Sequence, residues 1–182
     1  MVGYKIDRRN HDSTVGIPVT LGRKPANCFL AAQFRLRADD EGRYPAIETS
    51  FVGLFLDEEL DRTIAHWDYE RDYERDKRDG YPEAHLQVCA TSSAWDELCA
   101  ATRGDGRALE KLHFPTGLRR YRTTLEDVID FLIAEKIAEA HPSASEALAE
   151  GREKFRRTQL RAAVRRDPET AISILREMKK IE

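Results

Sequence analysis

The sequence lacks the features that would give the chain a disulfide framework or a place in a membrane. Only three of its 182 residues are cysteines, Cys28, Cys89 and Cys99, and no two of them form a CxxC pair. An odd count without paired spacing argues against a disulfide scaffold and against a cysteine-rich zinc site. No apolar run approaches the roughly 20 residues that a membrane span needs, and residues 1–7 lack the apolar stretch of a signal peptide. We therefore expect a soluble, cytoplasmic protein.

Familiar catalytic signatures are missing as well. The chain contains no Walker loop, no GxGxxG, no HExxH and no GxSxG motif. Its net charge of −3 does not indicate a molecule that binds polyanions with its whole surface. From these absences we expect no cofactor.

What the chain does contain is ample apolar material for a globular core and an unusually charged surface. Hydrophobic residues make up 41% of the sequence and charged residues 35%. The charges are segregated, because residues 57–79 hold ten acids and five bases, whereas residues 151–182 hold ten bases and five acids. Such complementary regions favour salt-sensitive contacts within a molecule or between subunits. We therefore expect a protein partner or a homo-oligomer.

Alternation of apolar and polar residues predicts an antiparallel sheet in the first half of the chain. The expected strands are Phe29–Arg37, Ala46–Leu56, Thr63–Tyr69 and Ala84–Thr91. The second is apolar on both faces over residues 51–56, which is typical of a central strand, so we place Phe51, Phe55 and Val88 in the core. A helix over residues 58–71 competes with the third strand, but the aromatic and β-branched residues there favour a strand.

Helical patterns dominate the second half. The expected helices run from Ser92 or Ser93 to about Thr102, from Thr123 to Ala140, from Ala144 to Arg165, and onward from Pro168. Thr123 with Glu126, and Ser143 with Glu146, have the spacing of capping boxes. This order predicts an α+β fold, a small antiparallel sheet of about four strands packed by helices. We divide the chain into an N-terminal arm (1–27), a core domain (28–140) and a charged helical C-terminal appendage (141–182). We expect the arm to be mostly irregular, with a short edge strand over residues 17–21 as the alternative.

Side chains suited to chemistry gather in two short segments. Residues 81–88 contain Tyr81, His85 and Gln87, and residues 113–122 contain His113, Arg119, Arg120, Tyr121 and Arg122. His85 and Gln87 share one face of their strand because side chains alternate along it. The helix that follows the second segment must pack back on the sheet, so we expect the two segments to form one surface.

Three interpretations of that surface compete. Histidine can take or give a proton near neutral pH and arginine can grip a phosphate, so His85, His113 and Arg119 are candidates for metal-independent RNA cleavage. In the second interpretation the surface binds RNA or phosphate without chemistry, through Gln87, Arg120, Arg122 and the stacking rings of Tyr81 and Tyr121. In the third, residues 113–115 are a rigid packed turn and the arginines neutralise the acidic segment.

A metal site is the least favoured use of these residues. His85, Gln87 and His113 would supply two imidazoles and an amide, without a carboxylate at a diagnostic spacing. We therefore expect no metal.

Several segments carry a resemblance to known sequences. AHLQV (84–88), LHFP (112–115), RRYR (119–122) and LEDVIDFL (125–132), with RRTQLRAAVRRDPETA (156–171), resemble a group of actinobacterial proteins of unknown activity. Proteins of that group look as though they are encoded beside helix-turn-helix regulators or mobile elements. The order of elements is also distantly similar to small toxin-like proteins. The resemblance implies a bacterial interaction module from a toxin–antitoxin-like, mobile-element or defence locus. The alternative hypothesis is an RNA-cleaving toxin-like enzyme that uses His85, His113 and an arginine.

Overall fold

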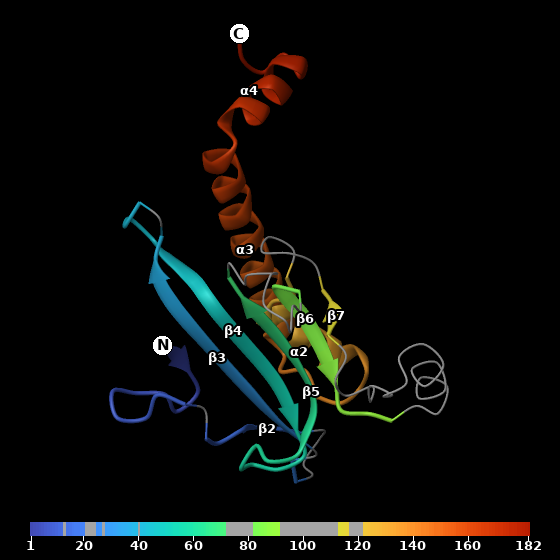
Figure 1. Ribbon diagram of the computed structural model, residues 1–182. Helices are drawn as coiled ribbons and strands as arrows, with labels where there is room; N and C mark the ends of the chain where they lie inside the picture. The colour runs from blue at the N-terminus through green and yellow to red at the C-terminus, as the bar shows by residue number, and fades with distance from the viewer. Residues whose placement is uncertain are drawn as a thin grey trace, which may run out of the picture. The chain divides into compact units, whose positions relative to one another are not determined.

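The computed structural model describes residues 1–12, 14–20, 25–26, 28–39, 41–71, 82–91, 113–116 and 122–182. The chain divides into two compact units, Met1–Glu139 and Ala140–Glu182. In the described residues the first unit is a sheet with one helix and the second is a pair of helices (Figure 1). The helix expected near residues 92–102 lies outside the described residues.

The first unit is built on an antiparallel sheet that has seven strands within the described residues. They are β1 (Val2–Gly3), β2 (Ile17–Val19), β3 (Cys28–Ala38), β4 (Pro45–Phe55), β5 (Thr63–Glu70), β6 (Ala84–Val88) and β7 (Phe114–Pro115). The strand order is β1-β3-β4-β5-β6-β7, and β2 also pairs with β3. The α+β class with an antiparallel sheet is confirmed, but the expected number of about four strands was too low. The additional strands β1, β2 and β7 have only two or three residues, too few to show alternation.

The four long strands lie where the sequence predicted them, except that β6 ends at Val88 and not at Thr91. β5 is hydrogen-bonded to both β4 and β6, so residues 63–70 form a strand and the competing helix over residues 58–71 is wrong. β4 lies between β3 and β5, and Val52, Leu54 and Phe55 are buried in it, as expected for a central strand.

One helix of the first unit, α2 (Leu125–Ala134), covers one face of the sheet. Its Val128 and Leu132 are 1% and 2% exposed and belong to the same buried cluster as Leu30 and Leu54. We call this the α2 face. Because side chains alternate along a strand, the neighbours of these residues point to the opposite face, which we call the second face. Within the first unit, none of the described helices packs on it.

Two of the three expected core residues are less buried than predicted. Phe55 is 5% exposed, but Phe51 and Val88 are only partly buried. Val88 is the last residue of β6, and β7 pairs only with His85 and Leu86, so the end of β6 has no strand on that side among the described residues. Phe51 lies on the second face, where it lines a hollow described below.

The start of α2 differs by one residue from the prediction. The N-cap is Thr124 and its partner is Asp127, whereas the sequence suggested Thr123 and Glu126. The Asp127 N–H donates to Thr124 Oγ1 at 3.3 Å, and the Thr124 N–H donates to Asp127 Oδ2 at 3.0 Å. The helix ends at Ala134 and not at Ala140, because the chain turns at Lys136, whose φ is 58°.

This cap gives a test of where α2 begins. Thr124→Ala should lower the free energy of unfolding by about 1 kcal/mol, because Asp127 loses the acceptor for its backbone N–H. The matched change Thr123→Ala should have little effect. Urea unfolding of both variants measures the difference, and a larger loss for Thr123→Ala would return the cap to the position suggested by the sequence.

The second unit contains α3 (Ala144–Arg166) and α4 (Pro168–Glu177). The predicted start of α4 is confirmed, with Pro168 in its first turn and Asp167 accepting the Thr170 N–H at 3.1 Å. The capping box predicted for α3 is wrong. Ser143 is the N-cap, but its side chain makes no cap hydrogen bond, because its hydroxyl pairs with His141 Nδ1 at 2.8 Å.

Candidate functional site

A hollow of about 440 Å³ lies against β3, β4, β5 and β6. Its lining includes Gln33, Phe51, Asp68, His85, Gln87 and, just before β7, His113. The strand register explains why distant residues meet there. Gln33 pairs with Phe51, Phe51 with Asp68, and Asp68 with His85, so one row of side chains crosses four strands on the second face.

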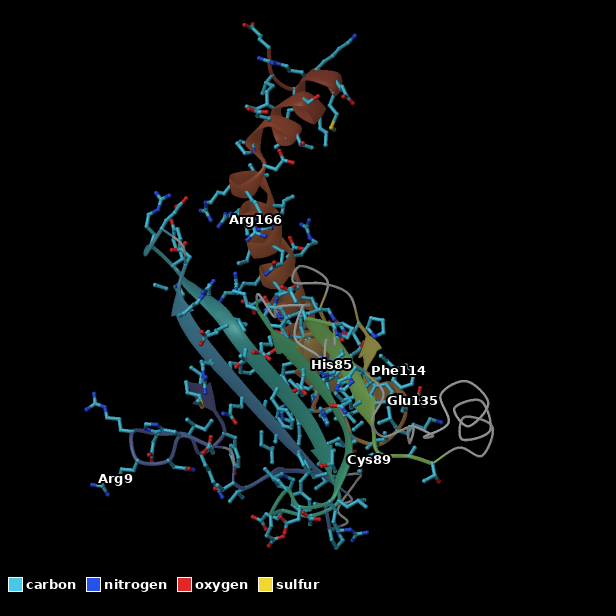
Figure 2. The ribbon with its side chains drawn as sticks, viewed as in Figure 1. Arg9, His85, Cys89, Phe114, Glu135 and Arg166 are labelled. Atoms are coloured by element: carbon cyan, nitrogen blue, oxygen red, sulfur yellow. The ribbon has the colours of Figure 1, made fainter. Side chains whose placement is uncertain are left out.

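His85 lies at the end of that row and is held on several sides. Its side chain is buried, with the residue only 3% exposed. Its Nδ1 lies 3.0 Å from the Pro82 carbonyl oxygen, which can only accept, so Nδ1 carries a proton. Its Nε2 lies 3.7 Å from Asp68 Oδ2. Figure 2 labels His85 on β6, close to Phe114 of β7.

His113 packs against His85 although 28 positions of sequence separate them. The two imidazole rings meet edge to face, with their centroids 4.7 Å apart. The structure thus brings together His85, Gln87 and His113, which come from the two segments that the sequence analysis placed on one surface.

Two residues that the sequence analysis did not nominate complete the cluster. His66 Nε2 lies 2.8 Å from Gln87 Oε1 and 3.3 Å from Asp68 Oδ2. Both oxygens accept, so this nitrogen carries the proton and Nδ1 holds the lone pair in the neutral ring. The hydrogen bond to Asp68 raises the pKa of His66 above its ordinary value, although burial acts in the opposite direction. Asp68 is therefore shared by two imidazoles, those of His66 and His85.

The pair of His66 and Asp68 predicts a pH dependence of stability. Because the folded-state pKa of His66 is raised, the pair stabilises fully below the unfolded pKa of about 6.5, and the contribution is lost as pH rises through the folded value. Asp68→Asn should therefore cost more at pH 5.5 than at pH 9, by about 0.5–1 kcal/mol for a pair that is partly exposed.

Urea unfolding at the two pH values measures this difference. The matched control is the same substitution in a His66→Gln background, where the pH-dependent part of the cost should shrink. An equal cost at both pH values in the parent chain would contradict the link between Asp68 and the charge of His66.

Arg122 packs on Tyr69, which lines the hollow, but Arg122 itself is not among the described lining residues. Its guanidinium carbon is 4.7 Å from the centroid of the Tyr69 ring, and the residue is 8% exposed. Tyr69 alternates with Asp68 along β5 and so shares the α2 face with Trp67, whose ring contacts Phe131 of α2 at 6.0 Å. Burial lowers the pKa of Arg122. Its expected role beside the histidines stays a prediction.

The other candidates from the sequence cannot be placed. Tyr81, Arg119, Arg120 and Tyr121 lie outside the described residues. Among the described residues that line the hollow there is no lysine or arginine, whereas two carboxylates, Asp68 and Glu70, are present. The described part of the lining is therefore suited to hydrogen bonding rather than to holding a phosphate.

Phe51, the apolar member of the row of side chains on the second face, packs with the rings of Phe55 and His66, and we call these three rings the aromatic floor. The ring centroids of Phe51 and Phe55 are 6.3 Å apart, and those of Phe51 and His66 are 5.6 Å apart with an interplanar angle of 30°. Gly53 between the two phenylalanines makes this possible, because a Cβ there would lie 2.6 Å from a carbon of each phenyl ring. The two rings therefore lie across the backbone of β4, in space that any other residue would fill.

The described residues offer no metal centre. They contain no group of three or more His, Cys, Asp or Glu side chains that could hold a metal ion. In the same part of the chain no helix is long and apolar enough to cross a membrane.

Comparison of the chain with protein-family models, with curated proteins and with solved structures finds no match in any of the three. Function therefore has to be argued from the chemistry of the site.

Proposed function

We propose that this chain is a cytoplasmic bacterial interaction module, a partner in a toxin–antitoxin-like, mobile-element or defence locus, and that it binds through the second face of its sheet. The observation that supports this is the hollow of about 440 Å³ on a face that no described helix of the first unit covers. Its lining combines an aromatic ring with hydrogen-bond donors and acceptors, which is typical of binding sites. The bacterial setting rests on the resemblance of segments such as AHLQV and LHFP.

The geometry favours binding over catalysis for a specific reason. His85 is almost fully buried, and its two ring nitrogens face the Pro82 carbonyl and the Asp68 carboxylate. A histidine held in this way stabilises the second face and orders the row of side chains along it. The guanidinium of Arg122, the described arginine among the candidates, lies 4.7 Å from the Tyr69 ring, and Arg122 is not among the described residues that line the hollow with His85.

Binding of a neighbouring gene's product tests this proposal. Thr49 lines the hollow, so Thr49→Arg should weaken binding at least tenfold by placing a long charged side chain there. Ala134 is exposed at the end of α2, and the matched change Ala134→Arg should leave binding unchanged. Titration calorimetry with the purified partner measures both. A larger effect from Ala134→Arg would move the interface to α2.

A second candidate function is a metal-independent RNA-cleaving, toxin-like enzyme that uses His85, His113 and an arginine. The contact between the two imidazole rings at 4.7 Å, beside the carboxylate of Asp68, favours it. One imidazole would take the proton of the 2′-hydroxyl while the other donates a proton to the leaving oxygen. In this hypothesis the arginine is Arg119, which lies outside the described residues.

Expression separates the two functions. An RNA-cleaving toxin should arrest growth unless its neighbour is co-expressed, and His113→Ala should relieve the arrest by slowing cleavage about 100-fold or more. His113 is partly exposed, so the same change should alter stability by no more than about 1 kcal/mol. Normal growth of cells that express the chain alone at high level would favour the interaction module.

A further inference from the structure

The ring of Phe51 lines the hollow among mostly polar side chains. Phe51 is partly buried and lines the hollow, whereas its neighbour Phe55 is buried. Gly53 lets both rings lie across the strand. The imidazole of His66 packs beside Phe51 at an interplanar angle of 30°, although His66 is not among the described residues that line the hollow. A partly exposed aromatic surface on an antiparallel sheet is the arrangement on which unstacked bases of single-stranded nucleic acids stack.

The rim of the hollow carries polar groups that can hydrogen-bond to the edge of a bound heterocyclic ring. Gln33 and Gln87 have amides, each with donors and an acceptor, and Asp68 has a carboxylate that only accepts. Gln33 is directly opposite Phe51 across β3 and β4, and Asp68 is directly opposite Phe51 across β4 and β5. Hydrogen-bonding groups therefore lie on both sides of the aromatic floor.

The charge of the lining indicates which part of a nucleotide would enter. Its described residues include Asp68 and Glu70 but no lysine or arginine, so a phosphate would meet negative charge there. An uncharged heterocycle would not be repelled. The volume of about 440 Å³ lies within the range of small-molecule sites.

We propose that this hollow binds a single unstacked nucleobase, with its ring stacked on Phe51 and its edge hydrogen-bonded to the groups on the rim. The proposal rests on the proposed function, since it uses the same surface, and it makes the group that enters the hollow a base of a single-stranded RNA rather than a side chain of a protein. The module would then hold single-stranded RNA by a base, with the sugar–phosphate backbone outside the hollow.

An aromatic side chain of a protein partner is the competing occupant, and the rim argues against it. A phenylalanine ring has no donor or acceptor, so it would cover the amides of Gln33 and Gln87 and the carboxylate of Asp68 without bonding to them. A nucleobase carries several donors and acceptors along its edge and can pair with them. This difference can be measured with small probes.

The experiment is a titration of the full-length chain followed by NMR, using the ring protons of Phe51 and the Hε1 proton of His66. The probes are adenosine, guanosine, cytidine and uridine, with ribose 5-phosphate and N-acetyl-tryptophanamide for comparison. We expect saturable shifts at both residues with at least one nucleoside and none with ribose 5-phosphate.

Variants locate the binding on the floor. Phe51→Leu removes the flat ring but keeps an apolar side chain, and should weaken nucleoside binding about tenfold or more. The matched change Phe131→Leu, at an exposed position of α2, should leave binding unchanged. If Phe51→Leu lowers the melting temperature strongly, Gln33→Leu replaces it as the test, because it removes a rim amide and should also weaken binding.

Three results would overturn the nucleobase site: no saturable shift with any nucleoside, binding of ribose 5-phosphate as tight as that of the nucleosides, or tighter binding of N-acetyl-tryptophanamide. If one of these results is found but Thr49→Arg still abolishes partner binding, the proposed interaction module is retained and only the nucleobase as its ligand class is rejected. Conversely, the chain could bind nucleosides while Thr49→Arg leaves partner binding unchanged. That result would contradict the proposed function and leave the base site intact.

Discussion

Phe55→Ala is expected to lower the free energy of unfolding by about 3–5 kcal/mol, which is the usual cost of removing a buried phenylalanine. Phe55 is 5% exposed at the end of the central strand β4, and its ring packs beside Phe51 and over Gly53. Alanine would leave a cavity at the edge of the aromatic floor. The loss should exceed that of any surface substitution in the same sheet.

Urea unfolding followed by tryptophan fluorescence measures this cost. Trp67 lies on β5, so its fluorescence reports on the first unit. Phe114→Ala is the matched control, because Phe114 is 39% exposed on the short strand β7 and should cost clearly less. Equal costs for the two variants would show that Phe55 is not part of a packed interior.

The sequence was sufficient for the long strands because their chemistry is periodic. In β5, for example, His66 and Asp68 alternate with Ala65, Trp67 and Tyr69, and the structure places these two sets on opposite faces of the sheet. Short elements left no such signal. β1 and β7 exist because they pair with β3 and β6, and two residues cannot show a period.

The predicted ends of helices were less accurate than the predicted strands, because several neighbouring residues can serve as the N-cap. Thr123 and Thr124 are adjacent, and each has an acid three residues later, so spacing alone does not choose between them. The sequence pattern also did not indicate that α2 ends as early as Ala134. Ile137 folds back so that its N–H donates to the Leu132 carbonyl at 2.8 Å, a tertiary preference that helical periodicity does not encode.

The composition of the candidate site could also be predicted only in part, because it depends on how two strands pair. Alternation put His85 and Gln87 on one face, and it also put His66 and Asp68 on one face. The two pairs become a cluster only when β5 and β6 pair in the observed register, with His66 opposite Gln87 and Asp68 opposite His85. The sequence did contain a signal for this cluster, because two consecutive strands each carry a pair of polar residues on one face.

The aromatic floor had a signal of a different kind. Residues 51–56 were interpreted as a fully buried strand because they are apolar on both faces. A glycine inside a strand, as Gly53 is between Phe51 and Phe55, often marks a place where another group approaches the backbone closely. In the structure this glycine accommodates both rings, and Phe51 remains partly exposed at the hollow. Apolar residues on both faces of a strand therefore do not by themselves separate a core position from a binding surface.

Leu132→Ala is the second substitution with a large expected effect, a loss of about 2–5 kcal/mol in the free energy of unfolding. Leu132 is 2% exposed and lies with Val128 in the cluster that joins α2 to Leu30 and Leu54 of the sheet. Its carbonyl also accepts N–H groups from Ile137 and Ala138, so the residue marks the point where the chain leaves α2. A cavity there would weaken the contact that holds α2 on its face.

The same unfolding experiment tests this, with Leu36→Ala as the matched control, because Leu36 is 41% exposed on β3 and should cost less than about 1 kcal/mol. The variant also separates the two faces of the sheet. Since the hollow lies on the face away from α2, Leu132→Ala should lower stability yet leave the His66 Hε1 signal and nucleoside binding unchanged while the chain is folded. Loss of binding in a folded Leu132→Ala chain would show that the two faces are coupled and that α2 positions the row from Gln33 to His85.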